Sequence, residues 1–184
     1  MTHRTKIGHH LGFWLATLAI TLAHSPVQAQ AEPYIPFQLT GTAIQNHDGD
    51  TFRLQTKERG VRVVRFSGSD TPETGQAYWR AARNTLRDLL AGQETTISCY
   101  KLDRHSRDVC HVTLGTTDVG VEMVRRGMAW YGYQFADELT EIQQTNYLAA
   151  ERFARENAFG LWSMPNPQPP WECRMLRRQR KKCR

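Results

Sequence analysis

The chain has 184 residues, with 24 lysines and arginines against 18 aspartates and glutamates and a net charge of +6. Without a predicted leader about 150 residues remain, which is enough for one domain with a hydrophobic core of its own. The four cysteines include no Cys-x-x-Cys pair, and this excludes the usual ligand spacing of a zinc ribbon.

Residues 1–31 have the composition of a signal peptide. A positive start precedes an uncharged, mostly apolar run over residues 11–23, and Ala29-Gln30-Ala31 offers small residues for cleavage. We expect cleavage after Ala31, or after Ala29 as a second choice, and export to the periplasm or the medium. An uncleaved membrane anchor is the alternative, but the 13-residue run is short against the roughly 20 residues that a spanning helix needs.

All four cysteines follow the predicted leader, at positions 99, 110, 173 and 183. An even number in an exported chain indicates two disulfides, although four cysteines allow three pairings. Pairing of neighbours is the simplest arrangement: Cys99 with Cys110 would join two adjacent strands, and Cys173 with Cys183 would close a small loop near the C-terminus. Free thiols in a reduced compartment are the alternative.

Alternating polar and apolar residues predict five strands, at 38–45, 51–56, 61–66, 95–101 and 108–114. The Asp-Gly pair between the first two strands is a strong hairpin signal. After Pro72 the apolar residues recur at three-to-four spacing from Tyr78 to Leu90, which predicts a helix ended by Gly92.

Two further helices are expected after the last strand. Asp118 is placed as the N-cap of a short helix ending at Gly127. A longer helix covers about 137–158 and ends before Gly160; its predicted apolar side consists of Leu139, Ile142, Leu148, Phe153 and Ala154. Three strands, a helix, two strands and then helices predict an α+β fold, a five-stranded OB-type barrel with about three appended helices over 32–163.

Residues 164–184 differ in composition from this domain. Four of the six positions after Met164 are proline, which predicts an extended linker. The tail from Trp171 holds seven basic residues and one acidic residue, which leaves 15 basic and 17 acidic residues in 32–170. Such a basic tail attracts nucleic acid or another polyanion, for instance an anionic membrane or cell-wall polymer. A solvated, disordered end explains it equally well.

Two short acidic motifs, Asp48-Gly49-Asp50-Thr51 and Asp70-Thr71-Pro72-Glu73, stand at the ends of apolar runs. Each has a purely structural interpretation, the first as a turn and the second as a helix cap with a capping box. Together they bring carboxylate and carbonyl oxygens, which Ca²⁺ prefers, to one end of a barrel.

Two arginines complete this candidate site. Arg65 and Arg107 could hold a phosphate through charge-assisted, forked hydrogen bonds. Glu73 is then a carboxylate in reach of a water molecule. A metal, a guanidinium clamp and a base are what phosphodiester hydrolysis requires, because negative charge builds on the phosphoryl oxygens as water attacks.

These motifs and three others, in order and in approximate spacing, resemble the thermonuclease family, also called staphylococcal nuclease-like. The others are Asp103-Arg104-His105-Ser106-Arg107, Val124 to Ala129, and Ala150-Glu151 followed by Gly160-Leu161-Trp162. The resemblance covers about 37–163. It implies an OB-fold barrel, Ca²⁺ dependence, and cleavage of DNA and RNA to products that end in 3′-phosphate.

The resemblance also implies roles for individual residues. Asp50 and Asp70 would bind Ca²⁺ through their side chains and Thr71 through its carbonyl, with Asp48 in a supporting position. The expected transition-state stabilisers are Arg65 and Arg107, the expected general base is Glu73, and the residue expected near the nucleotide phosphate is Tyr133.

The sequence departs from the family pattern before the second arginine, where many members have Tyr-Gly and this chain has His105-Ser106. The lost glycine stiffens the turn that carries Arg107, and the imidazole of His105 could stack on the substrate or add charge at low pH. The loop after Glu73 is also short, which predicts a more open site.

The expected protein is therefore an exported, monomeric, Ca²⁺-dependent nuclease acting on DNA and RNA. The alternative from another class is an OB barrel that binds nucleic acid without cutting it. The five site positions argue against that alternative, because they are still Asp, Asp, Arg, Glu and Arg. A third possibility is a nuclease anchored at the cell surface by an uncleaved N-terminal helix.

Overall fold

The structure is a computed structural model that describes residue 1 and residues 33–183. The signal peptide predicted for 1–31 therefore lies outside the described residues, except for Met1. Residues from Pro33 onward, including the basic tail, form one compact unit. Within the described part of the chain, no helix has both the length and the apolar character needed to cross a bilayer.

Five strands form a closed barrel, as predicted. They are β1 (Phe37–Asn46), β2 (Thr51–Thr56), β3 (Gly60–Phe66), β5 (Glu94–Leu102) and β6 (Asp108–Leu114). Their order is β3-β2-β1-β5-β6, with antiparallel neighbours, and β3 also pairs in parallel with β6, which closes the barrel. The expected OB-type α+β architecture is confirmed.

The seam between β3 and β6 has its own polar clamp. Arg62 donates two hydrogen bonds to the buried carboxylate of Asp108, at 2.8 and 2.7 Å, and the Tyr34 hydroxyl donates a third at 3.0 Å. A buried carboxylate is costly unless its oxygens are paired. The forked guanidinium contact supplies that pairing across the one parallel strand pair of the barrel.

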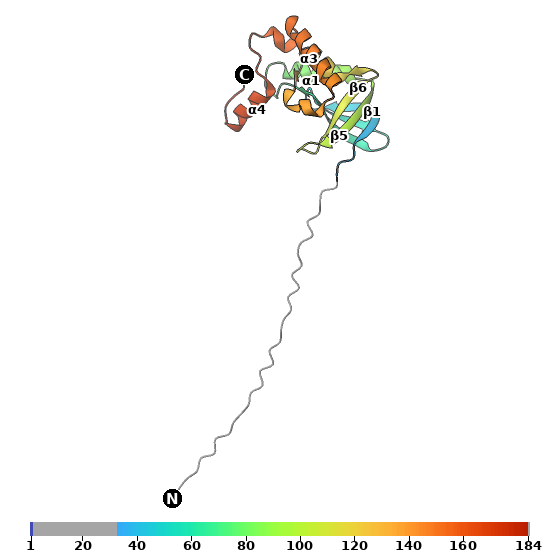
Figure 1. The fold of residues 1–184 in the computed structure, drawn as a ribbon, viewed down its shortest axis with the longest axis vertical. Coiled ribbons are helices and arrows are strands. Elements are labelled where there is room, and N and C mark those ends of the chain that lie inside the picture. Colours follow the sequence, from blue (N-terminus) through green and yellow to red (C-terminus); the bar gives the residue numbers. More distant parts are fainter. Residues whose placement is uncertain (2–32, 184) are drawn as a thin grey trace. The chain divides into compact units, whose positions relative to one another are not determined.

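Helices and short strands complete the unit (Figure 1). The α-helices are α1 (Trp79–Leu90), α2 (Val119–Arg125), α3 (Glu141–Glu156) and α4 (Pro170–Arg178), and the 3₁₀-helices are η1 (Tyr133–Glu138) and η2 (Gly160–Ser163). Short strands occur at β4 (Ser69–Asp70), β7 (Thr117–Asp118) and β8 (Trp130–Tyr131). Figure 1 shows the labelled helices gathered to one side of strands β1, β5 and β6.

The predicted apolar side of the third helix is mostly wrong. Ile142, Leu148 and Phe153 are exposed by 74%, 46% and 39%. The buried residues of α3 are Tyr147, Ala150, Glu151 and Ala154, which are spaced as one face of a helix. Size and hydrophobicity are misleading here, because α3 packs a tyrosine, two alanines and a hydrogen-bonded glutamate against α2, β8 and η2.

The predicted helix caps have mixed outcomes. Asp118 is the N-cap of α2, with its side chain accepting the Val121 amide, as expected. The structural interpretation of Asp70 as a helix cap is wrong, since α1 begins after Tyr78 and has no side-chain cap. Asp70 lies instead in β4, paired with Trp130 of β8, and its carboxylate is left for other contacts.

Both simple cysteine pairings are confirmed, Cys99–Cys110 and Cys173–Cys183. The first joins residues that face each other across β5 and β6. The second lies in the tail, where the structure departs from expectation. From Pro170 the chain forms α4 instead of an extended linker. A proline and Glu172 in the first turn and Arg177 in the last turn favour this helix, because they suit its ends and its dipole.

Candidate active site

The β1–β2 turn carries the first carboxylate of the site. The His47 amide donates to the Thr51 carbonyl at 2.8 Å, and the Asp48 side chain accepts the Asp50 amide at 3.1 Å, so the turn is held at both ends. Gly49 is required by proximity, since a Cβ there would lie 2.8 Å from the Ala82 Cβ. Asp48 thus supports the turn that presents Asp50, as predicted.

Arg65 of β3 bridges the two predicted calcium ligands. It lies opposite Thr51 in the β2–β3 ladder. Its Nη1 donates to Asp50 Oδ1 at 2.6 Å and its Nη2 to Asp70 Oδ1 at 3.3 Å. One guanidinium therefore brings together carboxylates that lie 20 residues apart in the sequence.

Thr71 holds the other oxygen of Asp50. Its amide and its hydroxyl both donate to Asp50 Oδ2, at 3.0 and 2.9 Å. Gln134 of η1 donates to Asp70 Oδ2 at 3.3 Å. Asp50, Asp70 and Thr71 are all buried. With Thr51 and Arg174 included, the acidic pair accepts hydrogen bonds from five different segments.

Burial and charge set the protonation of this pair. Burial acts to raise the pKa of Asp50, but the charge of Arg65 and the hydrogen bonds from Thr71 outweigh it, and the pKa lies below its ordinary value. Burial raises the pKa of Asp70, although the hydrogen bonds from Arg174 act in the opposite direction. Burial and the nearby Asp50 carboxylate also raise the pKa of Asp48, to about 6.

Arg107 is positioned by Asp103 in the β5–β6 loop. Asp103 Oδ1 accepts the amides of His105 and Arg107 at 2.8 and 3.0 Å, and Oδ2 accepts Arg107 Nε at 2.7 Å. Arg107 Nη1 donates to Thr51 Oγ1 at 3.0 Å. Ser106 has φ 58°, so the residue that replaces the family's glycine occupies the left-handed region that glycine favours.

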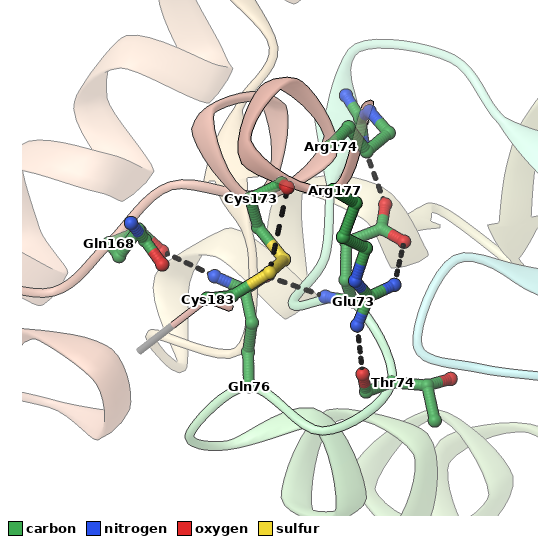
Figure 2. The surroundings of a disulfide bond; sticks show 8 residues. All are labelled: Glu73, Thr74, Gln76, Gln168, Cys173, Arg174, Arg177 and Cys183. Atoms are coloured by element: carbon green, nitrogen blue, oxygen red, sulfur yellow. Dashed lines mark hydrogen bonds and ion pairs between the residues drawn. A yellow bond between two sulfur atoms is a disulfide. The ribbon is translucent and has the colours of Figure 1, made fainter. Parts of the chain in front are cut away.

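Glu73 lies just beyond β4, and its carboxylate is paired with arginines of the C-terminal tail. Arg174 of α4 donates to Glu73 Oε1 at 2.8 Å and also contacts both oxygens of Asp70, at 3.0 and 2.6 Å. Arg177 donates to Glu73 Oε2 at 3.4 Å. Figure 2 shows Arg174 and Arg177 reaching Glu73 from the helix that carries Cys173.

These groups surround a single open cavity of about 750 Å³. Of the predicted residues it is lined by Asp50, Arg65, Thr71, Glu73, His105 and Arg107, and Arg174 lines it as well. Asp70 lies behind this surface, fully buried and joined to Arg65 and Arg174. The structure therefore brings together seven of the eight residues proposed from the sequence.

Tyr133 is the residue that does not join them. Its hydroxyl donates to Glu151 Oε2 at 2.6 Å, and it lines a separate surface depression along α3 with Arg152 and Arg155. The neighbouring Phe135 lines the main cavity instead. In this structure, η1 reaches the site through residues 134 and 135.

The oxygen donors fit a hard cation. Asp50 and Asp70 are buried carboxylates that share one guanidinium, and such a pair requires positive charge nearby. Arg174, a cation, supplies that charge in a two-pronged contact with Asp70. Among residues 33–183 no three His, Cys, Asp or Glu side chains form a metal-binding set, so a cation here would rely on the two aspartates, backbone oxygen and water.

Two functional residues were missed from the sequence, Asp103 and Arg174. Asp103 stands four residues before Arg107 and forms an ion pair with it across the β5–β6 loop, but no role is assigned to it from the sequence. Arg174 was counted only as tail charge. The proline at the start of α4 and the arginines in its last turn were the available signal for a helix.

The two arginines and Glu73 on this cavity suit the binding of a phosphate group and the activation of water. Arg65 and Arg107 meet at Asp50 and Thr51, because Thr51 Oγ1 donates to Asp50 Oδ1 at 3.0 Å and accepts from Arg107. Two guanidiniums on one cavity wall suit the oxygens of a phosphate group. A carboxylate on the same cavity, Glu73, can accept a proton from water.

Comparison with known proteins agrees with this chemistry. The family model described as "Staphylococcal nuclease homologue" matches residues 63–164. A "Micrococcal nuclease" of Shigella flexneri is 34% identical over 148 residues, 73% of this chain and 79% of the relative. "Protein ParB" of Escherichia coli is 31% identical over 173 residues, 86% and 88% of the two chains.

A third relative is an "Uncharacterized endonuclease" of Haemophilus influenzae, 31% identical over 135 residues, with 73% of this chain and 72% of the relative covered. The matched region contains the second half of β3 with Arg65, the acidic segment after it, Arg107 and α3. Fold, site and similarity thus agree, and the chain belongs to the staphylococcal nuclease family.

Proposed function

We propose that this family member is a Ca²⁺-dependent nuclease that hydrolyses phosphodiester bonds of DNA and RNA with little sequence specificity and leaves 3′-phosphate ends. Membership of the family makes it a phosphodiester hydrolase, an endonuclease. The cation, the substrate range and the products are the proposed part. A non-catalytic binding module is disfavoured, because every expected catalytic side chain is present.

The observation that carries the proposal is the joint placement of Arg65, Arg107 and Glu73 on one open cavity. The guanidiniums of Arg65 and Arg107 would bind the non-bridging oxygens of the scissile phosphate. As water attacks, negative charge accumulates on those oxygens, and two fixed guanidiniums stabilise it. Neither arginine needs to move far, since Asp50 and Asp103 already hold them.

Glu73 would accept the proton of the attacking water. Its carboxylate lies at the cavity edge, with a quarter of the side chain exposed, so water can reach it. The cation would be held by Asp50, Asp70 and the Thr71 carbonyl, and when bound it would polarise the phosphate as a Lewis acid. His105 lines the same cavity and is the side chain best placed to contact a base or sugar.

The test is a nuclease assay on single- and double-stranded DNA and on RNA with Ca²⁺, Mg²⁺ or excess chelator, with product ends identified. Arg65→Ala and Glu73→Gln should each reduce kcat by at least about 100-fold. Arg53→Ala is the matched control, since Arg53 is an exposed arginine of the same barrel. Full activity in chelator would refute the Ca²⁺ assignment, and 5′-phosphate ends would refute the product assignment.

Export and cleavage after Ala31 form a second part of the proposal. Two disulfides support it, because such bonds persist in oxidising compartments. We further propose a monomer whose exposed tail residues, such as Arg178 and Lys182, add non-specific attraction for nucleic acid. N-terminal sequencing of the purified protein would distinguish cleavage after Ala31 from an uncleaved anchor.

A further inference from the structure

The C-terminal strap, residues 164–183, returns to the active site and places a cation on its acidic residues. Arg174 Nη2 lies 2.6 Å from Asp70 Oδ2, and Nη1 lies 3.0 Å from Asp70 Oδ1 and 2.8 Å from Glu73 Oε1. One guanidinium therefore contacts both oxygens of an expected cation ligand and one oxygen of the expected base.

The strap is anchored independently of these ion pairs. Cys173 is fully buried and forms a disulfide with Cys183, which folds the chain end back onto α4. The Gln76 side chain donates to the Gln168 main-chain carbonyl at 3.1 Å. The Trp171 ring packs edge-on against the Trp130 ring, with 6.4 Å between the ring centroids. Figure 2 shows the disulfide and the Gln76–Gln168 contact beside Arg174. The position of Arg174 is thus set by a docked helix.

Arg177 extends the same contact toward the cavity edge. It pairs with Glu73 Oε2 at 3.4 Å and also donates to the Thr74 carbonyl. Together the two arginines occupy both oxygens of Glu73. Among the described residues, the cations that form ion pairs with Glu73 both belong to α4.

A divalent cation at Asp70 would have to displace this guanidinium. Asp70 is 1% exposed and both of its oxygens are engaged. Oδ1 accepts from Arg65 and Arg174, and Oδ2 accepts from Arg174 and Gln134, so a cation could reach these oxygens only by displacing a donor. The apparent affinity of the acidic pair for a cation therefore equals its intrinsic affinity multiplied by the fraction of molecules in which Arg174 is released.

We propose that the C-terminal strap is an internal competitor for the cation site: Arg174, docked on Asp70 and Glu73, competes with a cation for Asp70, so that cation binding and release of Arg174 are one coupled equilibrium. The proposal rests on the proposed Ca²⁺ site. It makes α4 an autoinhibitory element that also blocks the expected base until a cation is present. Linkage requires the coupling to be reciprocal, so Ca²⁺ must loosen α4 as much as α4 weakens Ca²⁺ binding.

The test is Ca²⁺ titration by isothermal calorimetry of the purified, chelator-treated protein, comparing wild type, Arg174→Gln and Arg178→Gln. Both variants lose one positive charge from α4, but Arg178 is exposed and lies outside the Asp70–Glu73 contact. Arg174→Gln should bind Ca²⁺ at least about tenfold more tightly than wild type. Arg178→Gln should match wild type.

A second measurement uses the unaltered protein and so does not depend on the folding of a variant. Amide hydrogen exchange in α4 should become faster when Ca²⁺ is added, while exchange in the barrel strands stays the same or slows. Unchanged or increased protection of α4 in Ca²⁺ would overturn the proposal, as would an Arg174→Gln affinity equal to or weaker than that of wild type.

The two hypotheses fail in different ways. If wild type and Arg174→Gln bind Ca²⁺ equally, the competition is refuted and the cation site stands, with Arg174 a neighbour that remains in place. If no protein binds Ca²⁺ and cleavage persists in chelator, the proposed Ca²⁺ dependence is refuted and the competition with it.

Discussion

At the scale of single residues, the site is a chain of mutually fixed charges. Asp50 is held by Arg65 and Thr71, and Arg107 is held by Asp103 and by the Thr51 hydroxyl. Fixed guanidiniums lose little reorganisation energy when charge develops on a bound phosphate. The residues that orient the arginines therefore matter to the rate as well as the arginines themselves.

Asp103 is the clearest case for a residue that acts through another. Asp103→Ala removes the acceptor of three hydrogen bonds in the Arg107 turn. A displacement of Arg107 by about 1 Å should reduce kcat by roughly 10- to 100-fold. Nuclease kinetics should show this loss mainly in kcat rather than in KM, with little change in thermal stability.

Asp103→Asn is the control for that prediction. Its amide oxygen can still accept the two backbone amides, although it loses the charge that pairs with Arg107. Activity should therefore be restored in part. A kcat within twofold of wild type for Asp103→Ala would contradict the positioning role.

At the scale of elements, the junction between β6 and α2 depends on a charged pair. His111 of β6 lies 2.7 Å from Asp118, whose other oxygen caps α2. The hydrogen bond that the His111 ring donates to the Asp118 carboxylate raises the pKa of His111, against the opposing effect of burial. Protonated His111 is thus stabilised in the folded state, and this links the stability of the junction to pH.

The sign of that pH dependence follows from the raised pKa. The contribution of His111 to stability is complete below its unfolded pKa of about 6.5 and is lost as the pH rises through its folded pKa. His111→Gln should therefore lower the free energy of unfolding more at pH 5.5 than at pH 9, by denaturant titration. An equal difference at the two pH values would contradict the ion pair.

The segment that follows α2 and the segment that follows α3 meet at another junction of elements. The Leu161 amide donates to the Gly127 carbonyl at 2.9 Å, and a Cβ on Gly127 would lie 2.1 Å from the Phe159 carbonyl oxygen. The segments after α2 and α3 therefore touch backbone to backbone. This close approach, rather than helix termination alone, accounts for the glycine at position 127.

At the scale of the whole molecule, the two disulfides belong to parts with different roles. Cys99–Cys110 joins the adjacent barrel strands β5 and β6, and both cysteines are buried. Cys173–Cys183 closes only the end of the strap. Proteins open locally as well as globally. Loss of the Cys99–Cys110 bridge should therefore lower global stability, and loss of the Cys173–Cys183 bridge should favour local opening of the strap.

The matched pair of variants is Cys99→Ala/Cys110→Ala and Cys173→Ala/Cys183→Ala. The first should lower the free energy of unfolding by roughly 2–4 kcal/mol. The second should leave barrel unfolding nearly unchanged while hydrogen exchange in α4 becomes faster. Denaturant titration and exchange measurements would decide; an equal loss of global stability in both would show that the strap and the barrel unfold together.

Much of the molecule could be predicted from the sequence. The five barrel strands, the α2 cap and both disulfides were predicted correctly, since each leaves a local pattern of alternation, capping or neighbouring cysteines. The buried side of α3 was predicted wrongly, because burial of Tyr147, Ala150 and Glu151 depends on what they face. Periodicity reports which residues share a face but not which face is covered.

In the acidic segment 48–73, too, some features follow from the local sequence and others depend on tertiary contacts. By itself the sequence determined the barrel and the residue types of the site, because side chains at strand ends and turns are set by local geometry. Only the tertiary structure decided that Asp70 is no helix cap and that Arg174, 104 residues away, lies on it. Local patterns carry no record of such a contact, since it arises only when α4 docks against the barrel.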